Sequence, residues 1–186
     1  MKEEITKAIS VLQNGGLIGY PTETFWAIGC DATNELAVQK LLLLTKNSSN
    51  TPIECLVAND AMLERHLENA PDIAFDLIDL ATKPTTIIYD NSKGIAKNLF
   101  FADNSVAIRV VSDTFCKYLI GSFKKPIVAA PINNNPKNRP KSFKEIDEAI
   151  LSGVDYVVNL HQENQALVSY SIIRLHNNGK VKVLRE

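Results

Sequence analysis

The sequence predicts a fold of the α/β or α+β class, with helices flanking a mixed sheet. Apolar residues follow helical and strand spacing in turn, and the type of spacing changes about every 10 to 15 residues. Near the end of the chain, Asn177-Asn178-Gly179 separates two apolar runs, and Asn-Gly is typical of a tight antiparallel hairpin. A sheet with both parallel and antiparallel strands is therefore favoured over a purely parallel one.

The first half of the chain begins with a helix that leads into a buried strand. Ile5, Ala8, Ile9 and Leu12 fall on one helical face, and Asn14-Gly15-Gly16 supplies a C-terminal stop. The apolar run that follows predicts a strand over 17–20. The same patterns predict a helix over 34–44, a strand over 53–58, helices over 60–68 and 71–80, and a β-branched strand over 85–89.

The second half continues the alternation. Ser112 is placed to cap a helix that carries Phe115, Cys116, Leu119 and Ile120, and the sequence from Ser142 to Glu145 fits a capping box for a helix ending near Gly153. The remaining elements are a strand over 106–110, a strand over 126–130, a polar loop over 131–141, and strands near 156–160, 169–175 and 180–184.

Length and composition predict one globular domain over residues 1–186. The chain has 20 Lys and Arg against 21 Asp and Glu, a net charge of -1, and 45% hydrophobic residues. No run approaches the ~18 apolar residues of a membrane span, and the start Met1-Lys2-Glu3-Glu4 is unlike a secretion signal. We therefore expect a cytoplasmic protein, monomeric or weakly dimeric.

Metal and disulfide chemistry are not expected. The three cysteines are scattered and form no Cys-x-x-Cys pair, so they are interpreted as reduced, mostly buried thiols. The three histidines have no metal-ligand spacing. The common glycine-rich nucleotide motifs and the Gly-x-Ser-x-Gly hydrolase motif are absent, so a bound nucleotide needs another kind of site.

The first candidate site is Tyr20-Pro21-Thr22-Glu23-Thr24, directly after the first strand. Proline cannot donate to a strand ladder, so the strand should end there and expose two hydroxyls and a carboxylate. That edge is where open α/β sheets place ligands. The alternative is a turn in which Thr and Glu only satisfy backbone groups.

The second candidate is a basic window from Lys124 to Lys144, which contains no acidic residue. The positive electrostatic potential of such a window favours binding of phosphate or an RNA backbone. The alternative is a solvated loop with incidental lysines. Asn133-Asn134-Asn135-Pro136 within it adds side-chain amides after an apolar strand. The phosphate or RNA patch is assigned to Lys124, Lys125, Lys137, Arg139 and Lys141.

These residues together resemble the YrdC-like family. Its opening motif has the form Gly-Gly-(apolar)-Pro-Thr-Asp/Glu-Thr-x-(aromatic)-Gly-Leu-Gly. The matching segment here is Gly15-Gly16-Leu17-Ile18-Gly19-Tyr20-Pro21-Thr22-Glu23-Thr24-Phe25-Trp26-Ala27-Ile28-Gly29-Cys30-Asp31-Ala32. The later matches are Lys46, Lys83 to Ile88, Val106 to Arg109, Pro126 to Asn133, Ser171 to Ile173 and Val183 to Arg185. The resemblance covers nearly the whole chain, and it implies a single YrdC-like domain without the additional C-terminal domain that some longer family members carry.

The resemblance implies a YrdC-like twisted, mixed parallel and antiparallel sheet flanked by helices, with a concave basic groove. In that family the groove binds L-threonine, bicarbonate and ATP with magnesium, and makes threonylcarbamoyl-adenylate for threonylcarbamoyladenosine in tRNA. The magnesium arrives with ATP, and no protein-ligated metal is implied. Possible macromolecular partners are tRNA or double-stranded RNA, and no membrane is implied.

Family roles carry over onto matching positions. The resemblance implies substrate contacts from Thr22, Thr24, Asn133 and Ser171. It implies nucleotide contacts from Lys46, Thr86, Arg109 and Arg185, with a structural role left open for Arg109. No catalytic residue is assigned.

Several positions depart from the family pattern and leave the activity open. Ser48 stands where an arginine is usual, Pro131 and Asn135 replace two serines, and Tyr170 stands where a Ser-Thr pair begins. Three hypotheses follow. The protein is a working synthase with an altered site, a catalytically impaired paralogue that binds RNA or a nucleotide, or an enzyme of a different carbamoyl- or acyl-adenylate chemistry.

Overall fold

The structure is a computed structural model that describes residues 1–46, 53–132, 140, 142–163 and 169–186. Its helices are α1 (Lys2–Gln13), α2 (Glu35–Thr45), α3 (Asp60–Arg65), α4 (Asp72–Asp79), α5 (Thr114–Phe123) and α6 (Glu148–Leu151), with 3-10 turns η1 (Lys97–Leu99) and η3 (Phe143–Glu145). Its strands are β1 (Ile18–Pro21), β2 (Trp26–Gly29), β3 (Glu54–Val57), β4 (Thr85–Tyr89), β5 (Val106–Val110), β6 (Ile127–Pro131), β7 (Tyr156–Val157), β8 (Ser171–Leu175) and β9 (Val181–Arg185).

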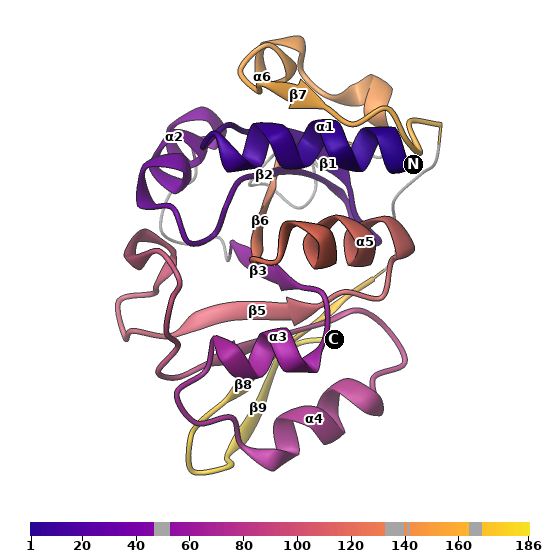
Figure 1. The fold of residues 1–186 in the computed structure, drawn as a ribbon. Coiled ribbons are helices and arrows are strands. Elements are labelled where there is room, and N and C mark those ends of the chain that lie inside the picture. Colours follow the sequence, from indigo (N-terminus) through magenta and orange to yellow (C-terminus); the bar gives the residue numbers. More distant parts are fainter. Residues whose placement is uncertain (47–52, 133–139, 141, 164–168) are drawn as a thin grey trace.

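The strands form one mixed sheet in the order β7-β1-β2-β6-β3-β5-β4-β8-β9. Parallel pairs join β1 to β7, β3 to β5 and β4 to β8, and the other neighbours are antiparallel. Helices α1, α5 and α3 lie in front of the strands in Figure 1, on one face of the sheet. The predicted α/β class and the mixed sheet are confirmed.

The C-terminal hairpin is also confirmed. Strands β8 and β9 pair antiparallel, and Gly179 between them has a φ of 80°, which favours glycine. The register shifts at Ile172 and Ile173, where Ile172 opposes Arg185 and Ile173 opposes Val183. This bulge lies at the edge of the sheet, where such irregularities are common.

Three local predictions were wrong. Strand β2 was not expected, because four residues that include a tryptophan and a glycine are too short to show strand alternation. Helix α5 is capped by Asp113, whose carboxylate accepts from the Cys116 N–H, and not by Ser112. Ser142 makes no capping bond; the chain forms only η3 there, and α6 starts later, capped by Asp147.

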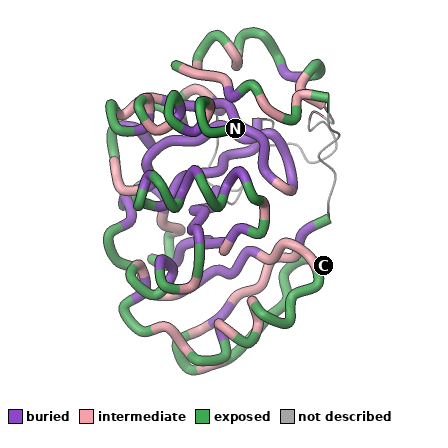
Figure 2. The backbone as a smooth tube through the Cα atoms, turned by 45° about the vertical axis from the view of Figure 1, so that its right-hand side comes forward, coloured by how far each residue is buried: buried purple, intermediate pink, exposed green. Residues whose placement is uncertain are grey.

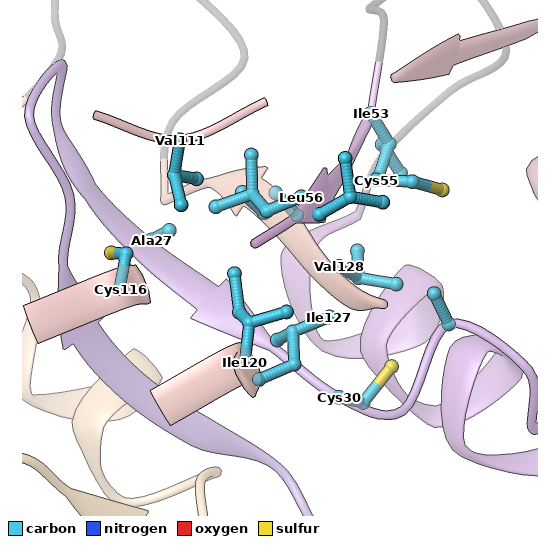
Figure 3. Packing of buried hydrophobic residues seen from close by; sticks show 14 of the residues in the cluster. Ala27, Cys30, Ile53, Cys55, Leu56, Val111, Cys116, Ile120, Ile127 and Val128 are labelled. Carbon is cyan, nitrogen blue, oxygen red and sulfur yellow. The ribbon is translucent and has the colours of Figure 1, made fainter. Parts of the chain in front are cut away.

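The core lies between the sheet and its helices, where most residues are coloured as buried in Figure 2. Figure 3 shows part of it, with side chains from α5 and from the central strands. Cys30, Cys55 and Cys116 are free, buried thiols, as the sequence predicts. None of the helices in the described part of the chain has the length and hydrophobicity that a bilayer span requires.

Candidate functional site

The turn that joins β1 to β2 is tightly bonded within itself. The Thr22 hydroxyl donates to the Phe25 carbonyl at 2.7 Å and accepts from the backbone N–H groups of Thr24 and Phe25. Thr22 and Thr24 are buried, with 7% and 5% exposure. The prediction that this turn exposes its hydroxyls was therefore wrong, because a two-strand hairpin folds the turn back and uses the Thr22 oxygen as its internal acceptor.

A buried ion cluster lies beside this turn. Arg109 of β5 donates from Nε to Glu54 Oε2 at 2.9 Å and from Nη1 to Glu23 Oε1. Its Nη2 also approaches the Thr24 hydroxyl at 3.4 Å. Burial alone lowers the pKa of Arg109, but the carboxylates of Glu54 and Glu23 outweigh it and raise that pKa above its ordinary value. Arg109 is thus charged and ties the turn to the centre of the sheet.

Thr86 and Arg109 point to the same face of the sheet. Their chain neighbours Thr85 and Val110 line a cavity of about 470 Å³ together with residues of α3 and α4. Because successive strand residues alternate sides, Thr86 and Arg109 face away from α3 and α4. The register that sets Ile87 opposite Ile108 also sets Thr86 opposite Arg109. The Thr86 hydroxyl is fully buried and has no hydrogen-bond partner among the described residues.

Tyr170 links the two outer parts of the sheet. Its ring lies 6.3 Å from the Phe25 ring, and Arg185 Cζ lies 4.3 Å from its centroid. Four strands separate β2 from β8, so in a flat sheet these strands would be roughly 24 Å apart. The contact between Phe25 and Tyr170 therefore requires a curved sheet, and a concave face is formed between them.

Several predicted site residues share this concave face. Register sets Arg185 opposite Ile172, and Ile172 opposite Thr86. Ser171 starts β8, is half-buried, and donates its N–H to the Pro84 carbonyl. These contacts and registers connect Thr22, Thr24, Thr86, Arg109 and Arg185. Ser171 instead pairs with Thr85, so its side chain belongs to the opposite face of the sheet.

Lys46 lies in a separate hollow. It ends α2 in the left-handed conformation, with a φ of 47°, and lines a cavity of about 620 Å³ with Ile132, Glu145 and Asp147. Ile132 follows β6, whose last residue, Pro131, pairs with Ala27 next to the turn. Lys46 and Ile132, the last described residues after α2 and after β6, therefore line one cavity. The predicted site residues that follow them, Ser48, Asn133 and Asn135, lie outside the described residues.

The predicted basic patch is described only at its two lysines before β6. Lys124 and Lys125 precede that strand, and the other predicted cations come after it in the sequence. Lys125 is also paired with the buried Asp31 at 2.7 Å. The assignment of Lys124 and Lys125 to a phosphate or RNA patch stays a prediction. Lys137, Arg139 and Lys141 lie outside the described residues.

No group of three His, Cys, Asp or Glu side chains within the described ranges is arranged to hold a metal ion. The acidic residues nearest the concave face, Glu23 and Glu54, are both bonded to Arg109.

Sequence reasoning missed three members of this site. Glu23 was included in the turn without a role, Glu54 was not considered, and Tyr170 was treated only as a departure from the family pattern. The available signal was the position of Glu54 within the apolar run 53–58, because a carboxylate in a buried strand needs a cation partner.

The chain is similar in sequence to a known family and to known enzymes. A family model for Sua5, YciO and YrdC proteins, described as "Telomere recombination", matches residues 10–186. Threonylcarbamoyl-AMP synthase of Hahella chejuensis is 30% identical over 154 residues, covering 82% of this chain and 83% of that protein. The synthase of Pseudomonas aeruginosa is 31% identical over 156 residues, covering 78% and 83%.

Solved structures show the same fold. E. coli YciO has a TM-score of 0.84 at 18% identity and covers 100% of this chain and 90% of its own. P. abyssi Sua5 complexed with L-threonine has a TM-score of 0.85 at 22% identity and covers 97% of this chain, which spans about half (53%) of Sua5. The match to the family model and the identity to the synthases agree with the resemblance of the opening motif. The chain belongs to the Sua5/YciO/YrdC family, whose matched relatives are threonylcarbamoyl-AMP synthases.

Proposed function

We propose that this protein is a threonylcarbamoyl-AMP synthase-like enzyme of tRNA threonylcarbamoyladenosine formation, acting in the cytosol as a single domain. Its substrates are L-threonine, bicarbonate and ATP. One observation carries the proposal: Thr24, Arg109, Thr86 and Arg185, from four separate segments, meet on one concave face. That face belongs to a chain whose family and relatives are synthases of this type.

The chemistry needs positioning more than covalent help. The amine of threonine adds to bicarbonate, water leaves, and a carbamate forms. A carbamate oxygen then attacks the α-phosphorus of ATP and expels pyrophosphate. Holding three reactants in line and offsetting phosphate charge supply most of the rate in such transfers. Magnesium enters with ATP and neutralises phosphate charge.

We further propose that turnover is slow. Tyr170 holds Arg185 against its ring, so a nucleotide must compete with this contact to recruit the cation. Ser48 replaces a usual arginine, and the loss of one charge-assisted phosphate contact costs about 1.5–3 kcal/mol. Lys46 remains as a cation for the phosphates.

A second function is favoured by the same aromatic contact. If Arg185 does not reach the phosphates, the protein acts as a catalytically impaired paralogue that binds a nucleotide or RNA. Such binding is expected to weaken as salt rises, because cations that contact phosphates release counterions. Affinity that is equal at low and high salt contradicts this electrostatic account.

The deciding experiment measures pyrophosphate release with threonine, bicarbonate and ATP. The unmodified protein is compared with a variant that carries Ser48→Arg, Pro131→Ser and Tyr170→Ser. A slow rate in the unmodified protein and a faster one in the variant are expected. A fast rate in the unmodified protein refutes impairment, and no threonine-dependent release from either protein favours the binding function.

A further inference from the structure

We propose that Glu23 recognises the α-amino group of L-threonine, through the carboxylate oxygen that Arg109 leaves free. This inference rests on the proposed function and names the residue that selects an amine at that site. Three observations carry it: the charge of the buried cluster, an unpartnered carboxylate oxygen, and an unpartnered hydroxyl on the same face of the sheet.

The buried cluster has more negative than positive charge. Its one cation, Arg109, has a fully buried side chain, and its two carboxylates, Glu23 and Glu54, have side chains that are 11% and 4% exposed. One guanidinium against two carboxylates leaves an excess of one negative charge. Buried charge is costly unless it is compensated, so the cluster favours a ligand with a positive group and disfavours bicarbonate or phosphate at this point.

The two oxygens of Glu23 have different surroundings. Oε1 accepts from Arg109, which fixes the carboxylate. Oε2 is buried and has no hydrogen-bond partner among the described residues. A carboxylate oxygen without a donor is expensive in a protein interior, where nearly all such atoms are bonded. The missing partner is therefore a hydrogen-bond donor that arrives with a ligand.

The Thr86 hydroxyl is the independent observation. It comes from β4, is 0% exposed, and has no hydrogen-bond partner among the described residues. It faces the same side of the sheet as Arg109 and lies opposite it in register. Glu23 Oε2 can only accept, and a hydroxyl can also accept. Two acceptors beside an excess negative charge suit a protonated amine, which carries several N–H donors and one positive charge.

Recognition of the amine also fits the order of the reaction. The amino nitrogen is the atom that must meet bicarbonate, and an α-amino group is mostly protonated at neutral pH. Glu23 would hold that nitrogen at the closed end of the turn, beside Thr24. If Glu23 only linked the turn to β5, the protein would bind ligands with and without the amine equally well.

The test is calorimetry with L-threonine alone, so that it needs neither ATP nor bicarbonate. The second ligand is 2,3-dihydroxybutyrate, which replaces the amine by a hydroxyl and keeps the rest. The unmodified protein is expected to prefer threonine by roughly 10- to 100-fold, the range of a charge-assisted hydrogen bond. Equal affinity for the two ligands overturns the inference without any variant.

The matched variants are Glu23→Gln and Glu54→Gln, which remove the same charge from the same cluster. Glu23→Gln turns an amide NH₂ toward the ligand, and threonine affinity should fall roughly 10- to 100-fold while affinity for the dihydroxy acid changes little. Glu54→Gln should keep the preference for the amine. Thermal unfolding of each variant reports on folding separately.

Two outcomes distinguish the inference from the function on which it rests. If the unmodified protein binds no L-threonine, the proposed function fails and the inference with it. If it binds threonine and Glu23→Gln retains the full preference for the amine, only the inference fails. If Glu23→Gln does not fold, Glu23→Asp is a second variant that retains the charge. The comparison of the two ligands in the unmodified protein still decides whether the amine is recognised.

Discussion

The guanidinium of Arg185 lies over the ring of Tyr170, with Cζ 4.3 Å from the ring centroid. The ring itself is 7% exposed and touches Phe25 on the far side of the concave face. A cation held over an aromatic ring at the surface is stabilised by about 0.5–1 kcal/mol. Any ligand that recruits Arg185 must first overcome that stabilisation.

Tyr170→Ser is therefore expected to change nucleotide binding and stability in opposite directions. Release of Arg185 should strengthen ATP binding up to about fivefold, the equivalent of 1 kcal/mol. Loss of the buried ring should lower the free energy of unfolding by about 3 kcal/mol. Tyr170→Phe keeps the ring and should match the unmodified protein in titration calorimetry with ATP, while urea unfolding measures the stability loss of the serine variant. Weaker ATP binding in the serine variant contradicts this account.

Lys125 is expected to act on stability and not on ligand binding. Its ammonium group lies 2.7 Å from Asp31, whose side chain is only 5% exposed. Lys125→Gln should lower the free energy of unfolding by about 1–3 kcal/mol, because a buried carboxylate loses its cation. Lys124→Gln, at the exposed neighbour, should be nearly neutral. Urea unfolding and ATP titration of both variants check this, and a loss of ATP affinity in Lys125→Gln would show that the lysine contacts ligand.

Glu4 should contribute to acid sensitivity. The Tyr156 hydroxyl and the Asn159 N–H both donate to its carboxylate, and they lower the pKa of Glu4 from its usual value of 4.5. Below that value the unfolded chain binds more protons than the folded one, so the contribution is present above the unfolded pKa and is lost as pH falls through the folded pKa. Glu4→Gln should remove it.

The expected difference is under about 1 kcal/mol, because this carboxylate is partly exposed. Urea unfolding across acid and neutral pH is the measurement. Glu3→Gln is the control, since Glu3 only pairs with Lys7 one helical turn away. An equal pH slope in Glu4→Gln and in the unmodified protein rules out the contribution.

The three thiols should be inert in the folded protein. Burial raises the pKa of Cys55 to about 12 and raises those of Cys30 and Cys116 as well. A thiol without thiolate character reacts poorly with disulfide reagents. Ellman's reagent should therefore label no cysteine until denaturant is added, and then all three. Rapid labelling of one thiol in native buffer contradicts its burial.

Strand and helix positions could be predicted from sequence wherever the pattern is local. The hairpin of β8 and β9 follows from Asn-Gly, whose glycine adopts the positive φ that such a turn needs. Capping was less predictable, since Ser112 and Asp113 are adjacent and either oxygen can reach a free N–H. The backbone conformation before α5, which the sequence pattern does not show, determines that Asp113 is the cap.

The site was less accessible to sequence reasoning because its contacts join distant segments. Thr22 and Arg109 stood out through family resemblance, but nothing near Glu54 in the sequence indicates that it meets Arg109. The same holds for Lys125, whose pairing with the buried Asp31 is not indicated by any residue near it in the sequence.

The curvature that joins Phe25 to Tyr170 also determines when the concave face is completed. The two rings meet across four strands, and most of the chain lies between Phe25 and Tyr170 in the sequence. Closing so long a loop carries a large entropic cost, and contacts of this kind form late in folding. During synthesis, β1 and β2 emerge early, while Tyr170 and Arg185 emerge much later. A ligand of the concave face would then bind only after the hairpin of β8 and β9 has docked.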